Sequence, residues 1–249
     1  MSASTNGRSA LPQAAMLVIG DEILSGRTKD KNIGYLADYL CDLGIDLEEV
    51  RIVGDHKARI VAALKELSRS YDLVFTCGGI GPTHDDITAD AVASAFGLKL
   101  VHHPQAVEIL RERCARRGWE LNEARLRMAR TPEGARLIAN SVSGAPGFII
   151  SNVYVMAGVP AIMQAMLDAL APELPTGVKM LSATVEAGRG EGDIADWLTA
   201  LQETHPQVRI GSYPYHDGKR FTTRIVLRSR MPEALERALS DVESRLQTG

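Results

Sequence analysis

The chain has 249 residues, of which 45% are hydrophobic, enough for one large globular domain or two modest ones. Its formal net charge of −3 gives no sign of a surface for nucleic acids or anionic membranes. No apolar run approaches the ~20 residues of a membrane-spanning helix, and the three widely spaced cysteines form neither a disulfide framework nor a zinc motif. We therefore expect a cytoplasmic protein that acts on small molecules, without nucleic-acid or membrane partners.

The first part of the chain alternates between strand and helix patterns. Residues 1–13 are small and polar and predict a flexible tail. Short apolar runs predict strands at 14–19, 47–53 and 72–76, and helical spacing predicts helices at 32–43, 57–67 and 85–96. This alternation predicts an α/β fold with a doubly wound, mostly parallel sheet.

The rest of the chain is divided by a break at residues 172–177, where two prolines and a glycine interrupt periodicity. Before the break we predict helices at 104–117, 122–129 and 161–170, with strand structure at 136–138 and across 147–155. After it we predict strands at 178–185, 208–213 and 220–228 and helices at 193–203 and 232–246. The predicted domains are an α/β domain at 14–173 and a small α+β domain at 178–249.

Two loops that contain candidate functional residues follow predicted strands of the first domain. One is the segment 20–26, which contains Asp21 and Glu22, and the other is the glycine-rich segment 76–88, which contains Asp85 and Asp86. Ligands of open α/β sheets bind at the carboxyl ends of the strands. We therefore expect the four carboxylates to converge on one crevice.

The glycine-rich loop has the features of an anion site. Gly78, Gly79 and Gly81 tolerate positive φ, and Thr83 with Asp86 has the form of a capping box that starts a helix. A helix N-terminus favours phosphate, whereas clustered carboxylates repel it unless a hard cation such as Mg²⁺ lies between them. The alternative is a purely structural turn, in which Asp85 or Asp86 only caps the helix.

Other residues are weaker candidates. His84 contacts a ligand or is an exposed turn residue, and Cys77 is more typical of packing than of catalysis. Asn32 is predicted as a helix N-cap. A solvated helix face is predicted for four arginines, Arg111, Arg113, Arg116 and Arg117. The tight turns at 143–148 and 158–160 are plain turns or donors of backbone N–H groups to the crevice.

Together these motifs resemble the molybdopterin-binding (MoaB/Mog) domain superfamily, and most closely the N-terminal part of the CinA family, competence/damage-inducible protein A. The resemblance is strong over roughly residues 14–170 and rests on the segments 20–26, 54–55, 78–88, 145–148 and 158–160, with Asn32. The second domain resembles the CinA middle region through the segments 190–191 and 210–214.

The resemblance implies a three-layer α/β domain whose crevice binds a pterin phosphate or a nucleotide pyrophosphate, in a protein that forms dimers or trimers. It implies pyrophosphatase activity on ADP-ribose with a divalent ion (Mg, Mn, Co or Ni), or else molybdopterin binding with adenylyl transfer. A ligand-binding module without catalysis is the third alternative. The C-terminal amidase domain of CinA proteins has no counterpart in these 249 residues, and its activity is not expected.

Carried over to this sequence, the resemblance gives three sets of site residues. The catalytic set is Asp85, Asp86 and Asp21. The metal ligands are Asp21, Glu22 and Asp85. The substrate-binding set is Gly78, Gly79, Gly81, Thr83, Asn32, Gly147 and Gly158.

Overall fold

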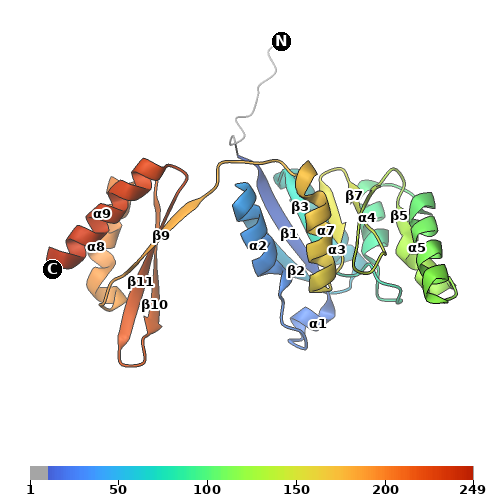
Figure 1. Ribbon diagram of the computed structural model, residues 1–249, viewed down its shortest axis with the longest axis horizontal. Helices are drawn as coiled ribbons and strands as arrows, with labels where there is room; N and C mark the ends of the chain where they lie inside the picture. Colours follow the sequence, from blue (N-terminus) through green and yellow to red (C-terminus); the bar gives the residue numbers. More distant parts are fainter. Residues whose placement is uncertain (1–10, 249) are drawn as a thin grey trace, which may run out of the picture. The chain divides into compact units, whose positions relative to one another are not determined.

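The computed structural model describes residues 11–248, which form two compact units (Figure 1). The boundary lies between Gly177 and Val178, and we call the residues before it unit 1 and those after it unit 2. The Gly177 amide donates to the carbonyl of Leu43 in unit 1 at 2.8 Å. The next carbonyl, that of Val178, accepts from Arg230 in unit 2 at 2.7 Å. Unit 1 therefore extends beyond the predicted end at residue 173.

A six-stranded sheet forms the middle of unit 1, in the order β2–β1–β3–β8–β7–β6. The first four strands run parallel, and β7 runs antiparallel to both of its neighbours. This confirms the predicted doubly wound, mostly parallel sheet. The strands are β1 (Gln13–Ile19), β2 (Asp46–Val53), β3 (Leu73–Cys77), β6 (Arg136–Ile138), β7 (Gly147–Ile150) and β8 (Val153–Met156).

The start of β1 corrects one expectation. Residues 1–10, most of the predicted tail, lie outside the described residues. Gln13, the last residue of that predicted tail, is the first residue of β1 and pairs with Asp46 of β2. Its amide also donates to a carboxylate oxygen of Asp72 at 3.0 Å. These two contacts place Gln13 in the sheet.

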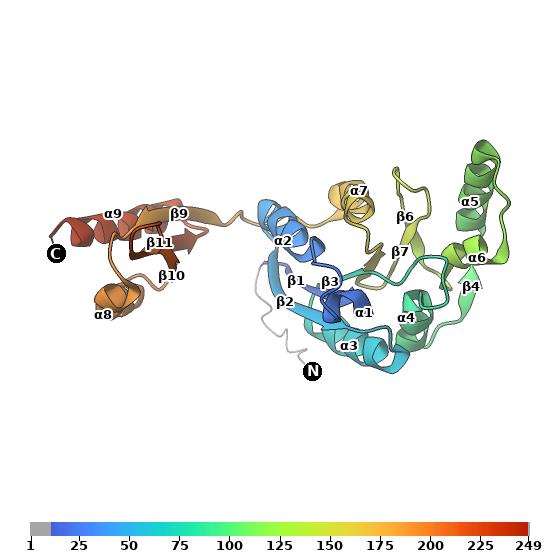
Figure 2. The ribbon, with the colours of Figure 1, turned by 90° about the horizontal axis from the view of Figure 1, so that it is seen from below.

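Helices cover both faces of the sheet and make unit 1 a three-layer structure (Figure 2). α2 (Asn32–Leu43) and α7 (Pro160–Leu170) pack on one face, and α3 (Lys57–Ser70) and α4 (Thr88–Phe96) pack on the other. Alternate residues of β1 enter the two cores, so that Met16 faces α2 and α7 whereas Leu17 faces α3 and α4. A strand buried on both faces has to be a continuous apolar run, as β1 is.

A smaller lobe lies beside the sheet. We define the α5–α6 lobe as α5 (Pro104–Arg117) and α6 (Glu123–Leu126) with the turn between them. Leu110 of α5 packs with Ala129 in a small separate core. The neighbouring elements are α1 (Asp21–Leu24), η1 (Arg127–Ala129), η2 (Ala171–Glu173) and the antiparallel pair β4 (Leu100–His102) and β5 (Arg130–Pro132).

Several predicted bounds differ from the structure, and two of the differences change a loop or turn of unit 1. The predicted strand region 147–155 is a hairpin, β7 and β8, whose turn places Ser151 at φ 54. Asn152 stabilises this turn by donating from Nδ2 to the carbonyls of Ser68 and Tyr71 at 3.0 and 2.8 Å. The predicted helix at 85–96 begins only at Thr88, because residues 82–87 form a closed loop described below.

Unit 2 is a three-stranded antiparallel sheet in the order β10–β11–β9, with two helices. Its elements are β9 (Leu181–Glu186), α8 (Glu191–Thr204), β10 (Arg209–His216), β11 (Phe221–Ser229) and α9 (Pro232–Thr248). Its own apolar core contains Ile194 of α8, Ile225 of β11 and Val242 of α9. Within residues 11–248, no helix combines the length and apolar character needed to cross a bilayer.

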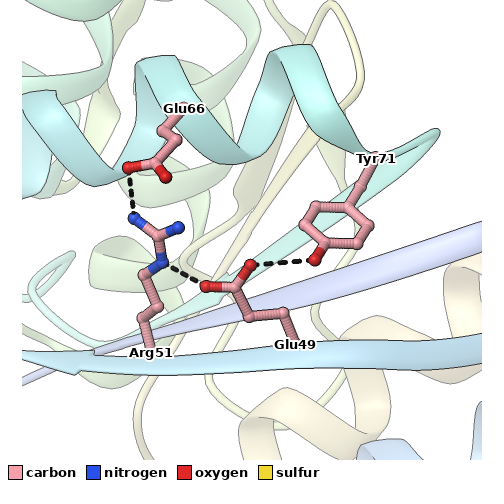
Figure 3. Close-up of polar contacts among 4 residues, drawn as sticks. All are labelled: Glu49, Arg51, Glu66 and Tyr71. Atoms are coloured by element: carbon pink, nitrogen blue, oxygen red, sulfur yellow. Dashed lines mark hydrogen bonds and ion pairs between the residues drawn. The ribbon is translucent and has the colours of Figure 1, made fainter.

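A polar network fastens the edge strand β2 to α3 (Figure 3). Arg51 pairs with Glu49 on its own strand and with Glu66 of α3, at 2.6 Å for the latter. The Tyr71 hydroxyl donates to the second oxygen of Glu49 at 2.8 Å. The hydrogen bond from Arg51 is the main cause that lowers the pKa of Glu49.

Candidate functional site

The glycine loop is held between the end of β1 and the start of α4. Thr88 ties it to α4: the Thr88 hydroxyl donates to the carbonyl of Gly78 at 2.9 Å, and the Thr88 amide donates to the carbonyl of Gly79 at 3.0 Å. Gly78 has φ 105, and a Cβ there would lie 2.0 Å from the carbonyl oxygen of Ile19. Only glycine meets both requirements, so the loop passes close to β1 with its backbone exposed to the crevice.

The carboxylate of Asp86 closes the loop on itself. Its Oδ2 accepts from the amide of Thr83 at 2.8 Å and from the Thr83 hydroxyl at 2.6 Å. Only one of the two contacts of a capping box forms, because the Asp86 amide donates to the Thr83 carbonyl at 3.3 Å and not to the Thr83 hydroxyl. No helix starts at Thr83, and regular helix begins only at Thr88. The other oxygen, Oδ1, takes no hydrogen bond from any residue between 11 and 248 and remains available to a ligand.

Asp21 has a structural role at the neighbouring loop. Its amide donates to Oδ2 of Asp55 at 2.9 Å, and the Asp55 amide donates back to Oδ1 of Asp21 at 3.3 Å. A Cβ at Gly54 would lie 2.2 Å from Oδ1 of Asp21, so this glycine leaves room for the carboxylate. The pair of aspartates joins the end of β1 to the end of β2.

Asn32 lies behind the glycine loop and is buried, with 5% of its surface exposed. It is not the N-cap that the sequence suggested, because Asp30 accepts the amides of Asn32 and Ile33 at 3.1 and 2.8 Å. Asn32 instead donates from Nδ2 to the carbonyl of Gly158 at 2.8 Å. A Cβ at Gly158 would lie 3.2 Å from Cα of Gly78. Asn32 thus holds the two glycine segments against each other.

A cavity of about 590 Å³ opens above these loops, entirely within unit 1. Six of the predicted site residues line it: Glu22, Gly78, Gly79, Gly81, Asp86 and Gly158. Five others do not: Asp21, Asn32, Thr83, Asp85 and Gly147. Gly147 is the first residue of β7, and a Cβ there would lie 2.4 Å from the carbonyl oxygen of Val155, so this glycine allows close packing within the sheet.

The far wall of the cavity contains residues that the sequence did not single out as a site. They are Arg113, Trp119, Arg125 and Asn140, and they line the cavity together with Ser143, which belongs to the turn singled out at 143–148. The helix face predicted to be solvated is therefore divided: Arg111, Arg116 and Arg117 are exposed, whereas Arg113 is partly buried beside the cavity. The one feature of the sequence that could have indicated this wall is the tryptophan that follows the arginine-rich helix and its terminal Gly118.

Acidic residues do not gather as densely as the sequence suggested. Among residues 11–248, no group of three or more His, Cys, Asp or Glu side chains is placed to hold a metal ion. Glu22 and Asp86 are the acids that line the cavity, and Asp85 is exposed outside it. His84 is also exposed outside the cavity. Burial raises the pKa of the Cys77 thiol to about 12, so this cysteine is not a thiolate nucleophile at neutral pH.

Comparison with known proteins identifies the family. A family model described as "Probable molybdopterin binding domain" matches residues 15–176. The chain belongs to this family. Residues 179–249 of this molybdopterin-binding domain protein match a second model, described as "FAD synthase, middle domain". The two matched segments correspond to unit 1 and unit 2.

Individual relatives agree with this assignment. The chain is 34% identical over 245 residues to a protein of Aeropyrum pernix, covering 93% of this chain and 91% of the relative. It is 36% identical over 209 residues to a CinA-like protein of Geobacter metallireducens, covering 80% of this chain but 50% of the relative. The crystal structure of CinA from Thermoplasma acidophilum, a protein of unknown function, is 30% identical with a TM-score of 0.61, covering 66% of this chain and 99% of that one. The resemblance to CinA-like proteins is confirmed, and the chain spans about half the length of the Geobacter relative.

Proposed function

We propose that the cavity of unit 1 binds a nucleotide or pterin phosphate, and that the protein hydrolyses the pyrophosphate of ADP-ribose or a related dinucleotide with a divalent cation. The observation that supports this most is the cavity wall, which joins the glycine loop to the carboxylates of Glu22 and Asp86. Backbone N–H groups of glycine loops hold phosphate oxygens closely because no side chain intervenes. The family description, a molybdopterin-binding domain, also supports a phosphate ligand with a flat ring system.

The cation would be held by Glu22 and Asp86 together with phosphate oxygens of the ligand. Mg²⁺ in phosphate sites is commonly bound by one or two carboxylates plus the substrate, without a cage made only of protein. The free Oδ1 of Asp86 and its position on the cavity wall fit this role. When bound, the ion would draw electron density from a phosphoryl oxygen, which favours attack of water on the phosphorus. Thr83 would keep Asp86 oriented through the two hydrogen bonds to Oδ2.

The test is release of AMP from ADP-ribose by the full chain with Mg²⁺, Mn²⁺, Co²⁺ or Ni²⁺. We expect Glu22→Gln and Asp86→Asn to lower the rate by ~10-fold or more, since each removes a cation ligand. Asp85→Asn is the matched control, because Asp85 is exposed outside the cavity and should keep the wild-type rate. Absence of turnover by the wild type with all four ions would refute the hydrolase proposal.

The second candidate is a molybdopterin-binding or adenylyl-transferring protein, which the description of the matched family favours. Tight binding of molybdopterin without ADP-ribose hydrolysis would support it, and transfer of an adenylyl group from ATP to the bound pterin would distinguish catalysis from binding. Binding without either reaction would leave a ligand-binding module. We also propose a homodimer or homotrimer, which light scattering of the full chain tests.

A further inference from the structure

Three arginines surround one tryptophan in the α5–α6 lobe. The guanidinium carbons of Arg117, Arg125 and Arg113 lie 4.9, 5.2 and 6.0 Å from the ring centroid of Trp119. Arginine cations are attracted to the face of an indole ring, which draws the positive charges together. We call these four residues the arginine–tryptophan cluster. Figure 2 shows α5 and α6 together at the side of unit 1 opposite α2.

The positive charge of this cluster has no counterion among residues 11–248. None of the three arginines forms an ion pair with a described residue, whereas Arg111 on the same helix pairs with Glu108. Arg125 donates to the carbonyl of Glu120, which is neutral. Burial, and then the charge of Arg117, lowers the pKa of Arg113. A partly desolvated cation without a partner is stabilised by an anion from outside the chain.

The cluster faces the same cavity as the glycine loop. Arg113, Trp119 and Arg125 line it, whereas Arg117 does not. The loop that contains Gly144 holds Arg113 in place, because a Cβ at Gly144 would lie 3.1 Å from Cδ of that arginine. Asn140 fixes this loop by donating to the carbonyl of Ala145 at 2.8 Å and accepting from the amide of Ser143 at 3.0 Å. The arginine is therefore held against an ordered loop.

The cavity also has an apolar part. Leu110, Met128 and Ile80 line this part, which suits a flat ring and a ribose better than a chain of phosphates. Guanidinium groups bind phosphate in bidentate fashion, and they do so best where water is partly excluded. The cavity thus combines two groups that suit phosphate, the glycine loop and the arginines, with an apolar lining.

We propose that Arg113 and Arg125 form a second anion subsite, so that the preferred ligand is a nucleotide with a second phosphate on the ribose, away from the phosphate at the glycine loop. This inference rests on the proposed function, since the glycine loop must hold the first phosphate. A nucleotide with a single phosphate occupies one of the two places only.

The test compares two ligands that differ by one phosphate, AMP and adenosine 2′,5′-bisphosphate. Trp119 itself reports binding, because the chain has two tryptophans and Trp197 of unit 2 can be replaced by Trp197→Phe. We expect the bisphosphate to bind the full chain ~10-fold more tightly than AMP, as hydrogen bonds to a charged group add affinity. We expect it also to change the emission of Trp119.

Variants then locate the second phosphate. Replacing both arginines, Arg113→Gln with Arg125→Gln, should reduce the preference for the bisphosphate to about one. Arg116→Gln is the matched control: Arg116 lies on the same helix, exposed and outside the cavity, and its loss should leave the preference intact. A preference that survives in the double variant would overturn the proposal.

Two outcomes separate this inference from the proposed function. Equal affinities of the wild type for AMP and the bisphosphate would overturn the second subsite and leave the nucleotide site standing. Failure of both nucleotides to bind would overturn the second subsite together with the nucleotide-binding part of the proposed function. These comparisons use the unaltered arginines, so they decide the question even if the double variant fails to fold.

Discussion

The side chain of Asn32 connects two loops of the cavity without touching the ligand space. Its Nδ2 donates to the carbonyl of Gly158, and its burial excludes water as a substitute partner. We predict that Asn32→Ala lowers the free energy of unfolding by ~1–3 kcal/mol, because the Gly158 carbonyl loses its partner. It should also weaken nucleotide binding, because Gly158 and Gly78 are no longer held together. Denaturant unfolding and calorimetric titration measure the two effects.

Asn152→Ala is the matched control for this prediction. Like Asn32, Asn152 donates from its side chain to backbone carbonyl oxygen, in this case to two carbonyls, those of Ser68 and Tyr71, but it lies in the β7–β8 turn outside the cavity. It should destabilise the protein without altering ligand affinity. Equal loss of affinity in both variants would show that Asn32 acts through general stability alone.

Two glycines of unit 1 should respond to alanine in opposite directions. Gly78→Ala introduces a Cβ 2.0 Å from the carbonyl oxygen of Ile19 at φ 105, so we predict a loss of more than ~2 kcal/mol and loss of ligand binding. Gly34 is exposed in α2, where a Cβ would meet no atom within 4 Å, and Gly34→Ala should stabilise the protein by up to ~1 kcal/mol. Thermal unfolding of both variants measures the direction of each change in stability. A Gly78→Ala protein as stable as the wild type would contradict the prediction that a Cβ at this position strains the loop.

The glycines of the loop were predictable from the sequence, and the arginines were not. Positive φ and close backbone approach require glycine, so the local sequence is enough to identify Gly78 and Gly79 as loop residues. Arg113 has the same helical context as its exposed neighbours. It becomes distinct only because a loop distant in sequence, at Gly144, packs against it. Asp86 and Asp21 show the same limit. From the sequence, a carboxylate in a turn is equally consistent with binding a ligand and with stabilising the turn, and only its hydrogen bonds distinguish the two roles.

At the scale of elements, local signals were enough to predict some helices fully. The predicted helices 32–43 and 104–117 have the observed bounds of α2 and α5, because each ends at a glycine in the left-handed region, Gly44 and Gly118. The start of α4 was predicted three residues too early at Asp85, since Thr83 and Asp86 satisfy each other within the loop. The β7–β8 turn was missed because Ser151 carries no glycine or proline signal.

The network between β2 and α3 predicts a dependence of stability on pH. Hydrogen bonds with Arg51 lower the folded-state pKa of both Glu49 and Glu66 below their usual value of 4.5. A carboxyl whose pKa is lower in the folded state stabilises the protein above its usual pKa, and this contribution is lost as the pH falls through the folded value. The free energy of unfolding of the wild type should therefore decrease as the pH is lowered below about 4.5.

Arg51→Leu should reduce that dependence, because without the guanidinium the two carboxyls titrate nearer their usual value. The effect is modest, since the side chain of Glu66 is 64% exposed and that of Arg51 is 28% exposed. Thermal unfolding of wild type and variant between pH 3 and pH 7, roughly the range spanned by carboxyl titration, measures it. Parallel curves for the two proteins would show that the network contributes nothing to acid sensitivity.

At the scale of the whole molecule, the chain consists of two units with separate cores. Met16 and Leu17 belong to the cores of unit 1, and Ile225 belongs to the core of unit 2. Sequence composition marked the connection at residues 172–177, and hydrogen bonds place its end at Gly177. What composition could not show is that Leu174, inside this apparent linker, is buried in the core of unit 1 with 5% exposed surface.

Because every residue of the cavity lies in unit 1, a chain that ends after Gly177 should bind AMP and ADP-ribose with about the affinity of the full chain. A second chain that ends after Glu173 is the control. It removes Leu174 from the core together with the hydrogen bond between Gly177 and Leu43, and should be less stable by ~2–3 kcal/mol. Calorimetric titration and thermal unfolding distinguish the two. If the chain ending after Gly177 remains folded but no longer binds nucleotide, then unit 2 takes part in ligand binding, and the site cannot be attributed to unit 1 alone.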